Sequence, residues 1–218
     1  MGTILASAII DKAQIVMQDT AATRWADAEC LGWLNHGQRA ACALRPDINS
    51  KTVAQATAAG TKQALPSEAT SLLDVVRNMG AGSTAGAPIR RASREMMDAV
   101  LPTWHTETAA AAFKHYVYDA RFPKLFYVYP PSTGTDAQVE VQYTLSPTDV
   151  AAVGNAISID DIYEPVLLDY ILYRACQKDA EIPGMADRAN THYQAFANAL
   201  SAKTNVDGSV VPAPGARP

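Results

Sequence analysis

The 218-residue chain is 48% hydrophobic, 18% charged and 7% aromatic, a composition that excludes a disordered chain and fits one medium or two small domains. Eighteen Lys and Arg against 22 Asp and Glu give a net charge of −4, so we expect no general phosphate-binding surface. Cys30, Cys42 and Cys176 show no CxxC spacing, which predicts neither a disulfide framework nor a zinc site, and no apolar run reaches the roughly 18 residues of a membrane helix.

The first 48 residues show two helical patterns. Apolar residues recur at helical spacing from Ile4 to Val16, and again from Arg24 or Trp25 to Leu44, where Pro46 ends the second helix. Because the connection between them is short, the two helices are expected to form an antiparallel hairpin in which each covers the apolar stripe of the other.

From residue 49 the sequence changes to short segments with β preference, separated by turn residues. The expected strands are Thr52–Thr57, Lys62–Leu65, Ser71–Arg77 and Ile89–Ala92. The glycine-rich stretch Asn78–Pro88 is expected to be a flexible loop. Ser93 is a candidate N-cap for a short helix that reaches Val100 before Pro102.

The clearest strand pattern lies between Phe113 and Leu145. Leu125–Tyr129 and Val139–Leu145 flank a turn-rich segment, and the second of them alternates apolar and polar residues, so we predict a hairpin. Phe113–Tyr118 is expected to supply another strand. Many of the aromatic residues fall in this region and can fill the core of a small sheet.

Two further helices are expected near the C-terminus, the first from Ile162 to Glu181. Its charged residues Glu164, Asp169 and Arg174 step by five, about 140° apart each time, so the helix has no polar face. Such a helix is either central or covered by another subunit, and we expect the second. Tyr170, Tyr173 and Arg174 are therefore candidate interface residues.

The last predicted helix, from Met185 to Lys203, is followed by an arm, 204–218, that is rich in proline and glycine and has no periodicity. Val206, Val210 and Val211 are its candidate contact residues. The fold class expected for the whole chain is α+β: a helical bundle made by the helix pairs 1–48 and 149–203, into which a small antiparallel β unit with one short helix, 49–148, is inserted.

A search for chemistry finds no catalytic constellation. No GxSxG turn is present, and His36, His105, His115 and His192 stand at no metal-ligand spacing, so no catalytic residue, cofactor or metal is predicted. Gly80–Ser83 resembles a phosphate loop only loosely, because the Lys-Ser/Thr ending is missing. Asp160, Asp161 and Glu164 are explained by helix capping and by the helix dipole.

Arg90, Arg91 and Arg94 form the one basic cluster in the sequence. They could touch phosphate, but in an acidic chain and without interleaved aromatic residues they are more typical of ion pairs at the surface or between subunits, so we assign them to a protein interface. Tyr127 and Tyr129 could stack on bases, although filling a sheet core is the commoner role of such residues.

The residues of the final helix pair resemble a known family. Tyr163–Leu200 contains the run LLDYILYRACQKDAEIPGMADRANTHYQAFANAL, which is similar to a tyrosine-rich helix followed by an alanine-rich helix in the phage adaptor proteins of tailed bacteriophages. Further matching residues, in order along the chain, are Arg24-Trp25, Leu31, Trp33-Leu34-Asn35, Gln38-Arg39, Leu44-Arg45-Pro46, Gly60-Thr61-Lys62-Gln63, Leu65-Pro66, Trp104, Tyr116 and Phe126-Tyr127-Val128-Tyr129-Pro130-Pro131.

This resemblance implies a structural protein of the virion and not an enzyme: a head-to-tail adaptor that forms a dodecameric ring between the portal protein and the tail tube or nozzle. DNA would pass through the ring without sequence-specific binding, and the C-terminal arm would reach the portal. The protein would be made in the host cytoplasm and reside in the virion neck.

Three alternatives remain at this point. A tail-completion or nozzle-associated protein would share the same assembly logic. A nucleic-acid-binding accessory protein would use Arg90, Arg91 and Arg94 together with the tyrosines of the sheet. A hydrolase built from scattered histidines and aspartates would lose its activity on substitution of His36 or His115.

Overall fold

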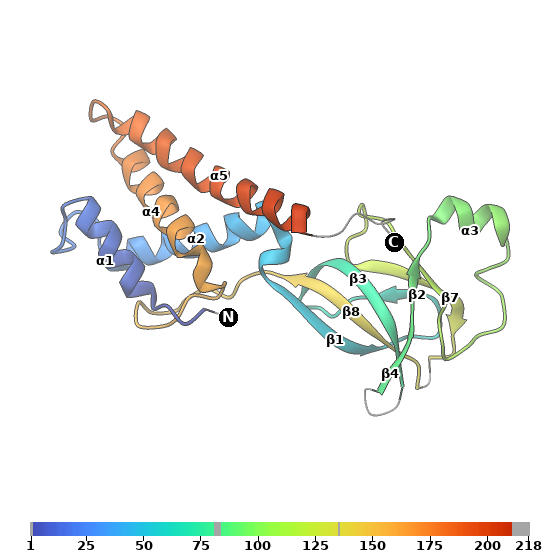
Figure 1. The fold of residues 1–218 in the computed structure, drawn as a ribbon. Helices are drawn as coiled ribbons and strands as arrows, with labels where there is room; N and C mark the ends of the chain where they lie inside the picture. The colour runs from blue at the N-terminus through green and yellow to red at the C-terminus, as the bar shows by residue number, and fades with distance from the viewer. Residues whose placement is uncertain (1, 81–83, 135, 211–218) are drawn as a thin grey trace. The chain divides into compact units, whose positions relative to one another are not determined.

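The computed structural model describes residues 2–80, 84–134 and 136–210, with side chains as far as Ser201. The chain divides into two compact units (Figure 1). Residues 1–48 and 147–218 form one of them, the helical unit, and residues 49–146 form the other, the β unit. Helices and two antiparallel or mixed sheets together place the chain in the α+β class.

Four helices make up the helical unit: α1 (Ala6–Val16), α2 (Asp27–Leu44), α4 (Glu164–Lys178) and α5 (Met185–Val210). A 3₁₀ turn at Pro46–Ile48 follows α2, where Pro46 ends the helix as expected. The four helices share one hydrophobic core, because the apolar stripe of each contributes fully buried side chains to it. The largest of these are Ile9, Ile10, Leu34, Leu167, Ile171 and Phe196.

Helix α4 is central within the helical unit, the first of the two positions that the sequence leaves open, so its apolar faces do not require cover from another subunit. It contacts α1, α2 and α5, and Leu167, Ile171 and Ala175 are fully buried. The charges spread around α4 are paired with different neighbours: Glu164 forms an ion pair with Lys12 of α1, and Asp169 lies 2.9 Å from His192 of α5. A helix surrounded on several sides needs no single polar face.

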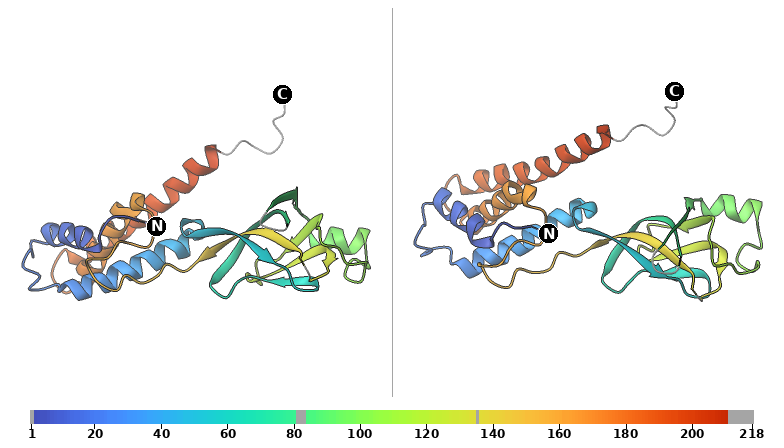
Figure 2. Two further views of the ribbon diagram at one scale, coloured as in Figure 1. Left: turned by 90° about the horizontal axis from the view of Figure 1, so that it is seen from below. Right: turned by 60° about the horizontal axis from the view of Figure 1, so that its bottom comes forward.

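Helix α5 is longer than predicted, because it continues through Val210 instead of ending at Lys203 (Figure 2). The first proline after Lys203 is Pro212, so no residue up to Val210 lacks the backbone N–H that the helix requires. Val206 and Val210 therefore belong to the helical backbone, although their side chains lie outside the described residues. Val211 and the rest of the expected arm lie outside the described residues as well.

The β unit contains two four-stranded sheets. In the first the order is β1 (Ser50–Ala56), β8 (Gln138–Leu145), β3 (Ala69–Gly80) and β4 (Thr84–Pro88). In the second the order is β2 (Gly60–Ala64), β7 (Leu125–Ser132), β6 (His115–Tyr118) and β5 (Arg90–Arg91). The first is antiparallel, whereas β5 and β6 are parallel, so the unit is not entirely antiparallel as predicted.

The two sheets enclose one core between them. Val139, Val141 and Tyr143 of β8 are buried, as the alternating pattern predicts, and they meet Phe126 and Val128 of β7 in the same cluster. Val141 is paired with Val53 on one side and with Val75 on the other. Strand β8 is therefore the centre of its sheet.

The predicted hairpin between Leu125–Tyr129 and Val139–Leu145 is wrong, because β7 and β8 belong to different sheets. Both edges of β8 are occupied, by β1 and by β3, and β7 pairs with β2 and β6. Alternation of apolar and polar residues identifies a strand with one buried face, but it carries no information about which strand lies beside it.

The glycine-rich stretch Asn78–Pro88 is also not a loop throughout. Strand β3 continues to Gly80 and pairs with β4. The buried Asn78 side chain donates to the carbonyls of Ala87 and Phe113 at 3.0 and 2.8 Å and accepts from Phe113 N–H at 2.6 Å. A Cβ at Gly86 would lie 2.8 Å from the carbonyl oxygen of Asn78, so glycine lets β4 approach this closely.

Helix α3 (Arg94–Val100) begins where the sequence predicts. The hydroxyl of Ser93 accepts a hydrogen bond from the backbone N–H of Met96 at 3.2 Å, which confirms Ser93 as the N-cap.

Candidate partner-binding groove

A cavity of about 920 Å³ opens on the β unit, over the second sheet and beside α3. Sheet residues, the start of α3 and two loop segments contribute its walls. We call it the groove, and its lining residues are Lys62, Arg91, Ala92, Ser93, Arg94, Glu95, Trp104, His105, Val117, Tyr118, Asp119, Ala120, Arg121, Phe122, Leu125 and Tyr127.

The groove brings together two of the three arginines of the predicted basic cluster. Arg91 of β5 lines it with its guanidinium 5.8 Å from the centre of the Tyr118 ring, and Arg94, the first residue of α3, lines it as well. Arg90 does not line the groove. Successive side chains of a strand point to opposite faces, so the neighbours Arg90 and Arg91 are separated by the local backbone.

The floor of the groove is held in place by Trp104. Its ring is buried and stacks on His105 with centroids 3.7 Å apart, and its Nε1–H donates to Asp98 at 2.9 Å. Tyr127 contacts the Trp104 ring by its edge, and His105 Nδ1 lies 2.8 Å from the hydroxyl of Thr61. These contacts fix the aromatic rings in single orientations.

Charge in the groove is predominantly positive. Lys62, Arg91, Arg94 and Arg121 line it, against the carboxylates of Glu95 and Asp119. Arg94 lies 3.4 Å from Asp98, and Arg121 lies 2.7 Å from Asp119. Hydrogen bonds from Arg121 lower the pKa of Asp119 to about 2. Within the part of the chain that the structure describes, Lys62 and Arg91 have no carboxylate partner.

Apolar surface lies at the edge of the groove. Phe122, one of the lining residues, is 61% exposed. Helix α3 also exposes Met96 and Val100, which stand four residues apart and hence on one face of the helix. The combination of arginine, aromatic rings and exposed apolar side chains is typical of the energetically important part of a protein interface.

Sequence reasoning missed much of this site. Trp104 entered only as part of a family resemblance, and Arg121 and Phe122 were not singled out. Trp104 lies in one loop and the adjacent residues Arg121 and Phe122 lie in another, and their shared location is a property of the tertiary structure. Of the two tyrosines considered for base stacking, Tyr127 lines the groove. Tyr129 does not line it, and its hydroxyl donates to Glu107 at 2.9 Å.

The predicted interface residues of α4 lie in the helical unit. Tyr170 is 9% exposed, and its ring lies 5.1 Å from that of Phe196 and 5.7 Å from that of Tyr173. Tyr173 and Arg174 are half-buried. Tyr170 is thus an internal packing residue of this chain, and the three residues do not form one exposed surface.

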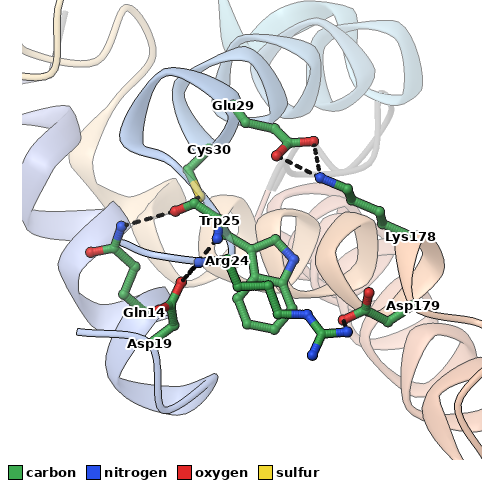
Figure 3. Close-up of polar contacts among 8 residues, drawn as sticks. All are labelled: Gln14, Asp19, Arg24, Trp25, Glu29, Cys30, Lys178 and Asp179. Atoms are coloured by element: carbon green, nitrogen blue, oxygen red, sulfur yellow. Dashed lines mark hydrogen bonds and ion pairs between the residues drawn. The ribbon is translucent and has the colours of Figure 1, made fainter. Parts of the chain in front are cut away.

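A separate polar cluster ties the connection after α1 to the rest of the helical unit (Figure 3). The carboxylate of Asp19 accepts hydrogen bonds from the backbone N–H groups of Thr23, Arg24 and Trp25, which lower its pKa. Ion pairs join Arg24 to Asp179 at 2.8 Å and Glu29 to Lys178 at 2.8 Å. These hydrogen bonds and ion pairs hold the connection between α1 and α2 in place, so the cluster has a structural role.

The acidic residues near α4 are also structural. Asp160 accepts from the N–H of Ile162 at 3.0 Å, as a capping residue does. Asp161 instead accepts from the backbone and hydroxyl of Thr3 at 2.7 and 2.6 Å, which holds the N-terminal segment and lowers the pKa of Asp161. Asp161 therefore does not take the helix-capping role expected for it, because its carboxylate is engaged with Thr3.

Across residues 2–80, 84–134 and 136–210, no group of three or more His, Cys, Asp or Glu side chains is arranged to hold a metal ion. Burial raises the pKa of both the Cys30 and the Cys42 thiols to about 11, so neither is a ready nucleophile at neutral pH. The same described residues contain no helix with the length and apolar character needed to span a bilayer.

Comparison with known proteins identifies the family of the chain. Residues 5–218 match the family model described as SU10 adaptor protein, whereas no curated protein matches the chain. The match includes both the helical unit and the β unit. The chain therefore belongs to the SU10 adaptor protein family, a family of phage head-to-tail adaptors with a structural role.

Proposed function

We propose that this adaptor forms a dodecameric ring in the neck of the virion, between the portal protein and the tail tube or nozzle, and that DNA passes through its channel without sequence-specific binding. It would be made in the host cytoplasm before it is incorporated. The observation that carries this proposal is the family match over residues 5–218, because it extends over both folded units.

The charge of the chain supports a channel that DNA can traverse. The helical unit contains nine Lys and Arg against fourteen Asp and Glu, a net charge of −5, and the β unit contains nine against eight, a net charge of +1. An acidic surface does not release counterions from DNA and therefore does not hold it. A ring closed by identical head-to-tail contacts also suits a chain with separate surfaces for its two neighbours.

Helix α5 supports a role for the C-terminal segment in docking to the portal. It has 26 residues against 15 in α4, a difference of about 16 Å in length at 1.5 Å per residue. Among the side chains that the structure describes, which end at Ser201, the last of α5 in the shared core is Leu200, and the helical backbone continues for ten residues beyond it. We propose that this extension and residues 211–218 contact the portal.

The experiment is electron microscopy of the purified adaptor mixed with the portal protein of the same phage. We expect a second ring stacked on one end of the portal, and we expect its loss in a chain that ends at Ser201. Retention of DNA by the free adaptor at low salt, lost as salt rises, together with portals that carry no second ring, would contradict the proposal and favour a nucleic-acid-binding protein.

A further inference from the structure

We propose that the groove of the β unit binds a segment of another virion protein that presents a carboxylate next to an apolar side chain. The inference that the partner is a virion protein rests on the proposed adaptor function. The chemistry expected of the bound segment rests on the groove alone. It gives the β unit a role distinct from ring closure.

The first step of the argument is charge. Arg94 and Arg121 each have a carboxylate partner in the chain, at 3.4 and 2.7 Å, and the Arg91 guanidinium rests against the Tyr118 ring. Among the described residues Arg91 and Lys62 lack an acidic partner. The helical unit, by contrast, is acidic. The chain has a net charge of −4, yet its groove contains two cations that lack a carboxylate partner among the described residues. An anionic group of a binding partner would neutralise them.

The second step is the apolar part of the site. The groove exposes the ring of Phe122 and is floored by a Trp104 that hydrogen bonds and ring stacking hold rigid. A rigid aromatic floor orders few side chains when a ligand binds, so little conformational entropy is lost. An apolar side chain placed beside the carboxylate would cover Phe122 and remove it from water.

The third step separates a protein segment from nucleic acid. Glu95 and Asp119 line the same groove and reduce its net positive charge, which weakens the attraction for a continuous phosphate backbone. Trp104 is buried, so the largest ring of the groove presents no free face on which a base could stack. A mixed pattern of positive and negative groups matches a polypeptide, which can offer a carboxylate to Arg91 and N–H donors to Glu95.

The size of the groove limits the occupant. Its volume of about 920 Å³ lies at the upper end of the range for sites that enclose a ligand, which corresponds to a few side chains and not to a whole domain. The partner therefore contributes a short segment, and a peptide is a suitable probe for the site.

The test is selection of a displayed random-peptide library on the full-length adaptor, followed by fluorescence anisotropy of the enriched peptides. We expect enrichment of Asp or Glu beside Phe, Leu or Ile. Arg91→Glu is expected to weaken binding about tenfold or more, because a charge-assisted contact becomes a repulsion. Arg90→Glu is the matched control: the same substitution one residue away, outside the groove, is expected to leave binding unchanged.

A second variant, Phe122→Ala, removes an exposed ring and should weaken binding without affecting folding. Three results would overturn the proposal: no acidic enrichment relative to selection on the Arg91→Glu protein, equal losses from Arg90→Glu and Arg91→Glu, or binding of single-stranded oligothymidine that depends on Arg91. The last would assign the groove to nucleic acid.

Failure of this inference is distinguishable from failure of the proposed function. Peptide binding is measured on the free adaptor and needs no ring, whereas stacking on the portal is observed by microscopy. A ring formed by the Arg91→Glu protein that no longer binds the selected peptide would separate the two activities directly.

Discussion

The helical unit and the groove of the β unit use their charged side chains in different ways. In the helical unit Lys12, Arg24 and Lys178 reach across to carboxylates on other elements, and Arg39 is paired with Asp149. In the groove Arg94 and Arg121 pair only with near neighbours in sequence, and Arg91 and Lys62 have no acidic partner within the described residues; the pairs Lys51–Glu68 and Arg77–Glu140, which link separate parts of the β unit, lie outside the groove.

This difference indicates that the cations of the helical unit named above are neutralised within the chain, whereas Arg91 and Lys62 of the groove are available to a partner. Cross-element ion pairs in the helical unit connect α1, α2 and α4 around a core that their own side chains fill. The groove of the β unit keeps unneutralised cations and an exposed aromatic ring. The predictions below test whether the two units unfold independently and whether each is stabilised by its own internal contacts.

The largest effect is expected from truncation of the two cores. Leu167→Ala in the helical unit and Leu72→Ala in the β unit each remove a buried side chain from a separate cluster, and each should lower the free energy of unfolding of its own unit by about 2–5 kcal/mol. Hydrogen exchange followed by mass spectrometry will locate the loss. Reduced protection in both units from either substitution would show that they fold as one.

The next largest effect concerns buried amides, which both units use in the same way. Asn35 bonds to both backbone groups of Val150, at 3.1 and 2.8 Å, and Asn78 bonds to both backbone groups of Phe113. Asn35→Ala and Asn78→Ala should each cost about 1–3 kcal/mol in denaturant unfolding, because buried backbone groups lose their partners. Asn190→Ala, at an exposed position, is the control and should change little.

A smaller effect tests the central position of α4. A Cβ at Gly37 would lie 3.0 Å from the Tyr170 ring, which Phe196 and Tyr173 hold in place, whereas a Cβ at Gly32 would meet nothing within 4 Å. Gly32→Ala should raise the free energy of unfolding by about 0.5–1 kcal/mol, and Gly37→Ala should lower it by about 1 kcal/mol. Equal stabilisation by both substitutions would mean that Tyr170 does not pack against α2.

The smallest effect is a pH dependence in the β unit. Arg121 holds the pKa of Asp119 at about 2, below its usual 3.8, so this stabilisation is fully present above pH 3.8 and is lost as the pH falls toward 2. The melting temperature should fall as the pH is lowered from 3.8 toward 2, and Asp119→Asn should remove the part of this fall that comes from Asp119. Glu95→Gln, on the same groove, is the comparison variant. An unchanged acid profile in Asp119→Asn would show that the Asp119–Arg121 pair does not form.

Features that depend on neighbouring residues in sequence could be predicted from the sequence. Pro46 ends α2, Ser93 caps α3, and alternation along Val139–Leu145 identifies both the strand and its buried face. Backbone hydrogen bonds of a helix and the two faces of a strand are set locally, so a short window of sequence is enough to determine them.

Only the tertiary structure decided which elements lie beside one another. The sequence predicted a β7–β8 hairpin and an external partner for α4, and both depended on contacts between residues far apart in the chain. The groove is of the same kind: Arg91, Trp104 and Phe122 come from three separate segments. Strand β4, which was expected to be a loop, pairs with the end of β3 just before it. The pattern of apolar and polar side chains indicates which surface of a helix or strand must be buried, whereas the chain topology determines which other element buries it.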